Sequence, residues 1–346
     1  MDVRRGHRLH RLQLLAHLQR CRLLHHGGRG DPRMGGQTHL TVPQSLDGAR
    51  FDLILARLAG VSRARARRMI ESGGAGLTAR GPAGGGRPST RLGAGDGLWF
   101  VPLETAPLRP HPVELDVRYE DRYLAVIGKP AGMVTHPGPG HVEATLVSAL
   151  LHRWPEVEGV GEYPRWGIVH RLDMETSGAI LIARHPLAHR RLTEAMAARE
   201  VRRRYLTLTH GGFAVASGTI EAPIDRRRTR RFVGPGGKPA VTHYRWLATW
   251  DRPVLSLLDV TLETGRTHQI RVHLGSIDRP VVGDRVYGRP ARAGVDPGRV
   301  WLHAHRLGLV HPVTRRDLDV EVPLTSDLRS SLEALGRPAD GEVPRE

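Results

Sequence analysis

The sequence predicts an α+β protein with a small N-terminal domain and a larger domain built on a mixed or antiparallel β-sheet with flanking helices. Beyond residue 116, strand-like apolar runs outnumber helical ones, and the two kinds do not alternate as they would around a parallel sheet. A proline-rich stretch divides the two parts. With 346 residues, 39% of them hydrophobic, the chain can bury two cores.

Residues 1–46 are a basic extension that we leave outside the predicted fold. The first 33 residues hold eight arginines and two aspartates, and their apolar run is too broken for a secretory signal. Three interpretations stay open: a basic amphipathic helix or transit peptide, a disordered basic tail, or a protein whose translation starts at Met34.

Residues 47–101 predict a small α/β domain with two short helices. In the first helix apolar side chains recur at helical spacing, at Phe51, Ile54, Leu55 and Leu58. The second helix exposes four arginines without interspersed acids, Arg63, Arg65, Arg67 and Arg68. This density favours contact with RNA over a merely solvated surface.

Two stretches of this part, "FDLILARLAGVSRARARRMIESG" and "GAGDGLWF", resemble the small RNA-binding domain named after ribosomal protein four of the small subunit. Between them, "AGLTARGPAGGGRPST" is richer in glycine than the strand, turn and strand usual in that domain. The resemblance implies an RNA-binding module, with a binding surface that is partly altered.

Residues 102–115 read as a linker, because proline favours extended backbone without a hydrogen-bonded ladder. Residues 116–336 follow as the larger domain, and residues 337–346 as a disordered tail. Five runs predict strands: "RYLAVIGKP", "SGAILIAR", "RYLTLTHG", "VLSLLDVTLET" and "HQIRVHL". Two predict helices: "ATLVSALLHRW" and "HPLAHRRLTEAMAAREV".

The formal net charge is +17, from 52 Lys+Arg against 35 Asp+Glu, and Lys129 and Lys238 are the only lysines. Arginine forks match phosphate, so nucleic acid is the expected partner, although a GC-rich genome accounts for part of the arginine preference. No run approaches the roughly 18 apolar residues of a membrane span. Cys21, the sole cysteine, excludes an internal disulfide and fits a cytoplasmic protein.

The segment "GIVHRLDMETSGAILIAR" sets Asp173 and Arg171 at the edge of an apolar run. Turn formers follow the aspartate, so its carboxylate can be held rigidly at the mouth of a cleft. A nearby guanidinium favours the ionised form, and an ionised, positioned carboxylate is a competent nucleophile. An aspartate that only caps a turn or pairs with its neighbour is the alternative.

"HRLDMETSG", "RRYLTLTHG" and "ETGRTHQIRVHL" occur in the order and spacing of the RluA-type pseudouridine synthases, which this chain resembles from about Asp47 to Leu335. "GKPAGMVTHPG", "RPVVGDRVYG" and "WLHAHRLGLVHP" match as well. The resemblance implies the pseudouridine synthase fold and an isomerase that needs neither metal nor cofactor. It also implies an RNA substrate, large-subunit (23S) ribosomal RNA or an assembling ribosomal particle, with transfer RNA as the alternative.

By the same resemblance, Asp173 is the nucleophile, acting at the anomeric carbon of the sugar or at the base. Tyr205 is the active-site tyrosine, with a ring beneath the flipped base and a hydroxyl poised for proton removal. Arg271 pairs with the carboxylate and Ile270 packs on the uracil. If "HQIRVH" were a regular strand, these two would face opposite ways, so we expect a twist or bulge there.

Arg171 corresponds to the arginine that fills the gap left by the extruded nucleotide, and a plain phosphate contact is its alternative. Four neighbours shape the loop rather than take part in chemistry: His170, Thr176, Ser177 and Gly178. We expect no metal site, because no histidine pair is accompanied by acids at ligand spacing. We expect a monomer. The rival reading is an RNA-binding assembly factor that does not turn over.

Overall fold

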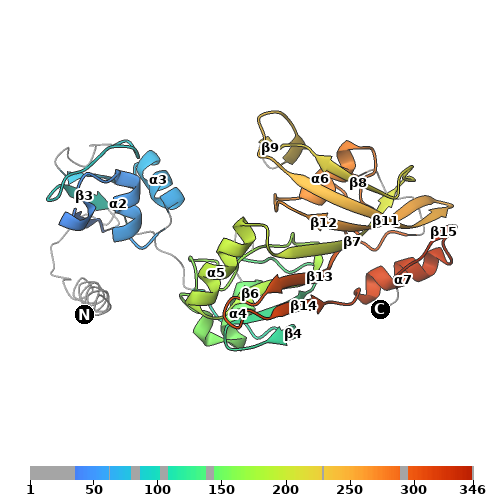
Figure 1. Ribbon diagram of the computed structural model, residues 1–346. Helices are drawn as coiled ribbons and strands as arrows, with labels where there is room; N and C mark the ends of the chain where they lie inside the picture. Colours follow the sequence, from blue (N-terminus) through green and yellow to red (C-terminus); the bar gives the residue numbers. More distant parts are fainter. Residues whose placement is uncertain are drawn as a thin grey trace. The chain divides into compact units, whose positions relative to one another are not determined.

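The computed structural model describes residues 36–61, 63–78, 86–101, 108–137, 144–227, 230–288 and 295–344. The chain divides into two compact units between residues 105 and 106, inside the predicted linker (Figure 1). The predicted extension up to residue 35, with the possible start at Met34, lies outside the described residues. Within them, every helix is too short or too polar to cross a bilayer.

The first unit is a three-stranded antiparallel sheet with two helices. Its elements are β1 (Thr38–Thr41), η1 (Gln44–Leu46), α2 (Phe51–Leu58), α3 (Arg63–Glu71), β2 (Ala75–Leu77) and β3 (Gly97–Phe100). β3 is the central strand. Phe51, Ile54 and Leu55 of α2 are fully buried against Met69 and Ile70 of α3, so the two predicted helices are present and form the core.

The predicted start of this unit at residue 47 is too late. β1 pairs with β3 from Thr38 opposite Phe100 to Thr41 opposite Gly97. Val42 and Leu46 then enter the core of the unit. A four-residue strand leaves too weak a sequence signal to be recognised without its partner, and only the pairing reveals it.

The second unit holds a ten-stranded mixed sheet, as the α+β prediction requires, with the order β15-β11-β12-β7-β13-β6-β5-β4 and with β14 on β13 and β8 on β11. All of these pairs are antiparallel except that of β13 with β6. A separate hairpin joins β9 to β10. The strands are β4 (Asp116–Glu120), β5 (Leu124–Lys129), β6 (Ser177–Ala183), β7 (Arg202–His210), β8 (Ser217–Glu221), β9 (Ile224–Arg227), β10 (Arg230–Val233), β11 (Val241–Asp251), β12 (Val254–Leu262), β13 (Leu302–Val310), β14 (Asp317–Glu321) and β15 (Asp340–Gly341).

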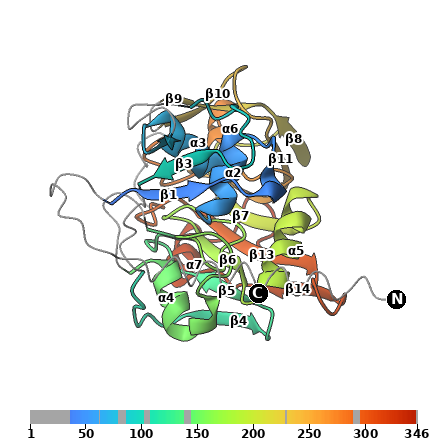
Figure 2. The same cartoon turned by 90° about the vertical axis from the view of Figure 1, so that its left-hand side faces the viewer.

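The helices of this unit are α4 (Leu146–Arg153), η3 (Pro155–Val157), α5 (Pro186–Ala197), α6 (Gln269–Ser276) and α7 (Ser326–Leu335). α4 lies beside β4 and β5 (Figure 2), and Trp154 at its end donates a hydrogen bond to Glu120 of β4. α5 packs on β6, and α6 packs on β10 and β11. α4 and α5 are the two helices that the sequence predicted.

The strand predicted over "HQIRVHL" is wrong, because these residues form α6. His268 has a left-handed backbone conformation (φ 58°), which ends the extended chain. The side-chain oxygen of Gln269 then accepts hydrogen bonds from the Arg266 N–H and the Thr264 hydroxyl. The alternating apolar residues suggested a strand. In the structure all of residues 269–274 are buried, and a helix that is buried on every side lacks the polar face by which a sequence pattern identifies a helix.

The predicted disordered tail is also wrong for residues 337–344. The Ala339 N–H donates to the Thr249 carbonyl and the Glu342 N–H to the Leu247 carbonyl, so β15 adds to the edge of β11. Val343 packs on the main core. The polar composition hid a segment that the edge strand orders through backbone hydrogen bonds.

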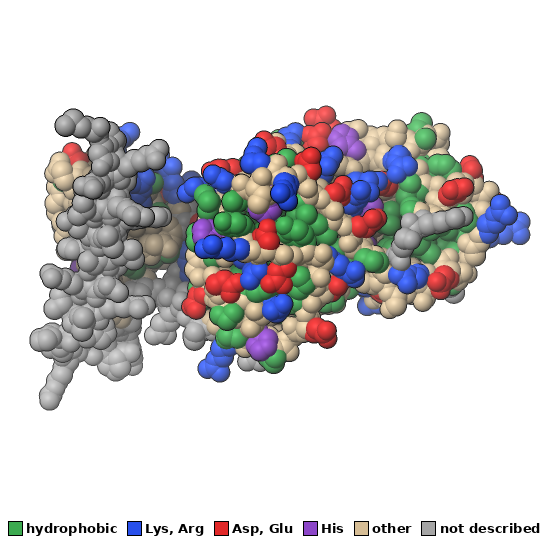
Figure 3. Space-filling model, turned by 60° about the horizontal axis from the view of Figure 1, so that its bottom comes forward, with side chains coloured by type: hydrophobic (Ala, Val, Ile, Leu, Met, Phe, Trp, Pro, Cys, Tyr) green, Lys and Arg blue, Asp and Glu red, His purple; other side chains and the backbone are tan. Residues whose placement is uncertain are grey.

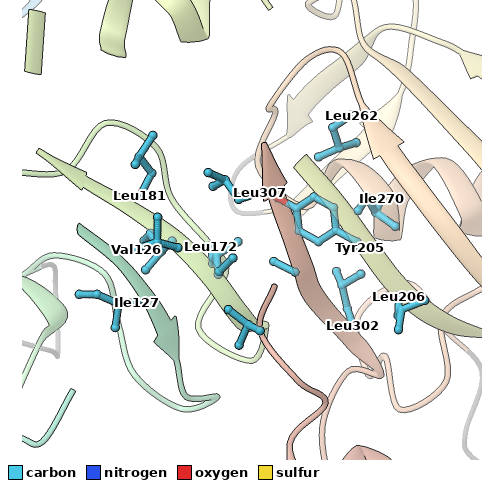
Figure 4. Packing of buried hydrophobic residues seen from close by; sticks show 14 of the residues in the cluster. Val126, Ile127, Leu172, Leu181, Tyr205, Leu206, Leu262, Ile270, Leu302 and Leu307 are labelled. Atoms are coloured by element: carbon cyan, nitrogen blue, oxygen red, sulfur yellow. The ribbon is translucent and has the colours of Figure 1, made fainter. Parts of the chain in front are cut away.

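One large hydrophobic cluster forms the main core of the second unit, and a small separate cluster of Ile224, Ala240 and Val272 lies between β9 and α6. Figure 4 shows two parts of the main core: Val126, Ile127 and Leu181 on β5 and β6, and Leu206, Leu302 and Leu307 on β7 and β13. Strands β5, β6 and the middle of β12 are buried throughout, so the sheet that carries the functional residues is rigid.

Candidate active site

A cavity of about 470 Å³ opens in the middle of the large sheet. Its walls come from five places along the chain: the loop before β6, the end of α5, the start of β7, the turn from β12 into α6, and Leu302 at the start of β13. Asp173, Arg171, Tyr205, Ile270 and Arg271 all line it. The structure therefore brings together the residues that the sequence predicted for catalysis and for contact with the flipped nucleotide.

Asp173 lies in a tight turn before β6, with its side chain 16% exposed. The Thr176 N–H donates to the Asp173 carbonyl, which closes the turn. Below it, buried Lys129 donates to the carbonyls of Pro130, Met133 and Met174. Burial lowers the pKa of Lys129 to about 7 against the opposing charge of Asp173. The aspartate thus projects from a backbone fixed on both sides.

The four residues predicted to shape this loop are all tied to the sheet. His170 Nε2 accepts a hydrogen bond from the Leu181 N–H, and burial lowers the pKa of His170 to about 3, so the ring is neutral. Buried Thr176 lines the cavity. Ser177 Oγ lies 2.9 Å from His303 Nδ1 and accepts from Arg299.

Gly178 permits the parallel approach of β6 to β13. Its φ is +110°, and a Cβ atom there would lie 2.2 Å from the carbonyl oxygen of Ala304. Any other residue would push the strands apart directly behind the Asp173 turn. The placement of these four neighbours fits the supporting role predicted for them.

Arg271 extends from α6 toward Asp173, with Nη1 3.9 Å from Asp173 Oδ2. Its other edge is held by Asp284, through Nε at 2.7 Å and Nη2 at 2.8 Å. Burial opposes the charge of Arg271, but the hydrogen bonds and charge of Asp284 outweigh it and raise the pKa of Arg271. The guanidinium is therefore a fixed cation that faces the Asp173 carboxylate.

Asp284 was not identified from the sequence. Besides Arg271, its Oδ1 accepts the N–H groups of Val286 and Tyr287 at 2.9 and 3.0 Å. Burial would raise the pKa of Asp284, but these hydrogen bonds and the charge of Arg271 lower it, so the carboxyl is ionised. Its stretch "RPVVGDRVYG" was noted as a match, but a pairing across 13 positions is not visible in a sequence.

Tyr205 on β7 lies beside Ile270 and Leu262 in the apolar wall of the cavity (Figure 4). Burial raises the pKa of Tyr205; the charge of Arg203 opposes this shift and that of Asp173 adds to it. The hydroxyl is therefore protonated at neutral pH. Because α6 is a helix, Ile270 and Arg271 both reach the cavity, and the twist or bulge that we expected for a strand is absent.

Arg171 is exposed at the cavity, in contrast to buried Leu172 beside it. Arg203 of β7 also lines the cavity, and the sequence reasoning missed it although it stands two residues before Tyr205 on a predicted strand. Successive side chains of a strand alternate in direction, so this spacing is a signal that could have found it.

The four arginines of α3 belong to the first unit and line no part of this cavity. Arg63 pairs with Asp52, and Arg67 pairs with Glu71 one turn away. Arg65 and Arg68 border a shallow depression of the same unit. The sequence analysis did not recognise that Asp52 and Glu71 pair with two of these arginines.

The arrangement can hold a planar base between Tyr205 and Ile270 and present a carboxylate to it, with a cation behind that carboxylate. Such a site suits nucleophilic attack by the carboxylate. Among the described residues, no three histidines, cysteines or acids lie close enough together to hold a metal ion.

Comparison with known proteins gives the same family from sequence and from structure. The family model described as RNA pseudouridylate synthase matches residues 123–276. An uncharacterized RNA pseudouridine synthase of Chloroflexus aurantiacus is 46% identical over 300 residues, 86% of this chain and 93% of that one. The ribosomal large subunit pseudouridine synthase D of Xanthomonas campestris is 40% identical over 314 residues, 85% of this chain and 91% of that one. The solved structure of human RNA pseudouridylate synthase domain containing 1 has a TM-score of 0.53 and 26% identity, and covers 70% of this chain and 94% of that one.

Proposed function

This chain belongs to the RNA pseudouridine synthase family, and from that premise we propose that it isomerises specific uridines of large-subunit ribosomal RNA to pseudouridine. It is an isomerase that acts on uridine in RNA. The choice of ribosomal RNA is supported by relatives at 38% to 40% identity whose names specify the ribosomal large subunit.

One observation carries the proposal: a carboxylate, Asp173, faces a buried cation, Arg271, in a cavity with an apolar wall. Asp173 would attack the target uridine at the anomeric carbon or at the base. The bond between N1 of uracil and the sugar breaks, the uracil turns, and its C5 forms the new bond to the same sugar carbon, while the bond to Asp173 breaks and the carboxylate is released. C5 then gives up its proton and N1 takes one up. No atom is gained or lost.

Tyr205 would support the base with its ring. Its raised pKa keeps the hydroxyl protonated, which favours this contact over removal of a proton by a phenolate. Ile270 packs on the other side of the cavity wall. The flipped base would thus leave the RNA stack for an apolar slot, which compensates part of the cost of unstacking.

The RNA backbone would be bound by arginines outside the slot. Arg171 at the cavity would fill the gap left by the flipped nucleotide or contact a phosphate. Each unit also carries a basic surface of its own. In the first unit it is the exposed face of α3, and in the second it is the hairpin of β9 and β10, on which Arg227 and Arg230 are exposed. On the face drawn in Figure 3 acidic and basic side chains are interspersed.

Because one chain supplies the whole cavity, we propose that the enzyme acts as a monomer, in the cytoplasm where ribosomal RNA is made. Free RNA or an assembling ribosomal particle would be its substrate. Transfer RNA is the alternative substrate, and an assembly factor that binds without turnover is the alternative from another class.

The test is to map pseudouridines in total RNA from cells with and without this gene, and to repeat the reaction with purified protein on unmodified large-subunit RNA and transfer RNA. We expect sites in large-subunit RNA to disappear with the gene and to be restored by the protein. If pseudouridines are lost only from transfer RNA, the proposal that ribosomal RNA is the substrate is wrong. Protein that binds RNA without forming pseudouridine would support the assembly factor.

A further inference from the structure

Arg203 of β7 has a guanidinium that is buried in the wall of the catalytic cavity without an acidic partner. The residue is 7% exposed. Its Nη2 donates two long hydrogen bonds, to the carbonyls of Leu262 and Glu263 at 3.3 and 3.4 Å. Its Nε is buried and has no acceptor in the described part of the chain.

The other buried arginines of the described residues differ in this respect. Arg271 is paired with Asp284, and Arg299 with Asp327. A buried cation without a counter-charge costs several kcal/mol, which folded proteins normally avoid by pairing. Arg203 is therefore the one buried arginine there whose charge is left to be balanced by something that the described residues do not supply.

Arg203 lies in the wall of the cavity, where its unbalanced charge would face a bound substrate. Arg203 and Tyr205 are two residues apart on one strand, so their side chains share a face, and both line the cavity with Asp173. The turn from β12 leaves room for the guanidinium, because a Cβ atom at Gly265 would lie 2.8 Å from Arg203 Nη1.

We propose that Arg203 binds a phosphodiester oxygen of the RNA strand next to the flipped uridine. What Arg203 lacks is a negative charge, and a phosphate brings one, whereas the uracil carbonyls bring only dipoles. Arginine presents parallel N–H donors that match phosphate oxygens. This inference rests on the proposed function only in that the cavity receives a nucleotide of an RNA strand.

The test compares Arg203→Gln with Arg204→Gln in the full-length protein. Arg204 is the next residue along β7; its side chain is held by Asp259. For each variant, KM and Kd for one RNA substrate are measured over a series of salt concentrations. Loss of one phosphate contact lowers the salt slope of log Kd by about 0.7 to 0.9.

We expect Arg203→Gln to raise Kd and KM by about tenfold or more and to lower the salt slope, with kcat nearly unchanged. Arg204→Gln should keep the wild-type slope. Gly265→Ala should show the same salt slope as Arg203→Gln, because the added methyl group displaces the guanidinium. It replaces Arg203→Gln in the test if that variant does not fold.

A salt slope equal to that of the wild type in both Arg203→Gln and Gly265→Ala would overturn the proposal. A fall in kcat or Tm with unchanged slope would do the same, because it would make Arg203 a support for the carbonyls of Leu262 and Glu263. Kd is measured independently of turnover, so failure of the proposed function, seen as absence of pseudouridine, is a separate result.

Discussion

The catalytic cavity and helix α3 both place arginine beside a carboxylate, but they differ in burial. In the cavity, the side chains of Arg271 and Asp284 are 4% and 0% exposed. On α3, those of Arg67 and Glu71 are 62% and 48% exposed. The same chemical pair is thus a fixed part of the core in one unit and a solvated pair in the other.

This difference separates two uses of arginine in RNA modification. Buried charges hold their geometry because each is desolvated and hydrogen-bonded, so removal of one partner disrupts the site. Exposed charges contribute little to stability, remain free to move, and attract phosphate at long range. We propose that the buried charges of the cavity position the substrate and that exposed surfaces such as α3 capture the RNA.

The largest expected effect on stability comes from Asp284→Ala, which leaves Arg271 buried without its hydrogen-bonded partner and with only Asp173, 3.9 Å away, as an acidic neighbour. We predict a loss of about 3 to 5 kcal/mol in the free energy of unfolding, with loss of activity. The control is Asp319→Ala, which breaks the exposed pair with Arg306 and should cost below about 1 kcal/mol. Denaturant unfolding measures both, and equal losses would contradict the importance of burial.

The region around the cavity should also lose stability at low pH, because it holds a buried, neutral histidine. His170 has a pKa of about 3 in the folded protein and about 6.5 when unfolded. Below about pH 6.5 the unfolded chain binds the extra proton, so stability falls as the pH drops toward about 3, by at most about 1.4 kcal/mol per pH unit. The free energy of unfolding should fall less between about pH 7 and about pH 5 in His170→Asn than in the wild type. An identical loss would mean that His170 does not contribute.

The smallest effect on stability is expected on α3. Arg68 is exposed, so Arg68→Gln should change the free energy of unfolding by less than about 0.5 kcal/mol while it weakens RNA binding and lowers its salt slope by about one. Arg63→Gln should also cost up to about 1 kcal/mol, since Asp52 loses one of its two arginines. Unchanged RNA affinity in both variants would remove α3 from the binding surface.

Local patterns in the sequence were sufficient for much of the fold. Strands β5 and β6 are apolar runs, β7 and β12 interleave leucine or valine with polar residues such as threonine, and α4 and α5 have clear helical spacing. The pattern failed where burial is complete on all sides, as in α6, and where a short segment depends on a distant edge, as β1 depends on β3 and β15 on β11. Tertiary context decides such segments, and a single sequence does not contain it in readable form.

The candidate site follows the same division. Asp173, Arg171 and their turn were visible because they lie within nine residues of one another in a dense motif. Asp284 was not, because its role depends on burial and on a partner 13 positions away. Arg203 could have been found from its spacing to Tyr205, but its lack of an acidic partner could not. Pairwise electrostatics of this kind becomes visible only when the fold has brought the groups together.

The most direct test of the central claim, that the Asp173 carboxylate is the nucleophile held opposite Arg271, is Asp173→Asn in the full-length protein. The amide keeps the size of the side chain and removes its charge and nucleophilicity. We predict that RNA is bound within about threefold of the wild-type Kd while pseudouridine formation falls by about a thousandfold or more. Pseudouridine formation at the wild-type rate in this variant would contradict the account.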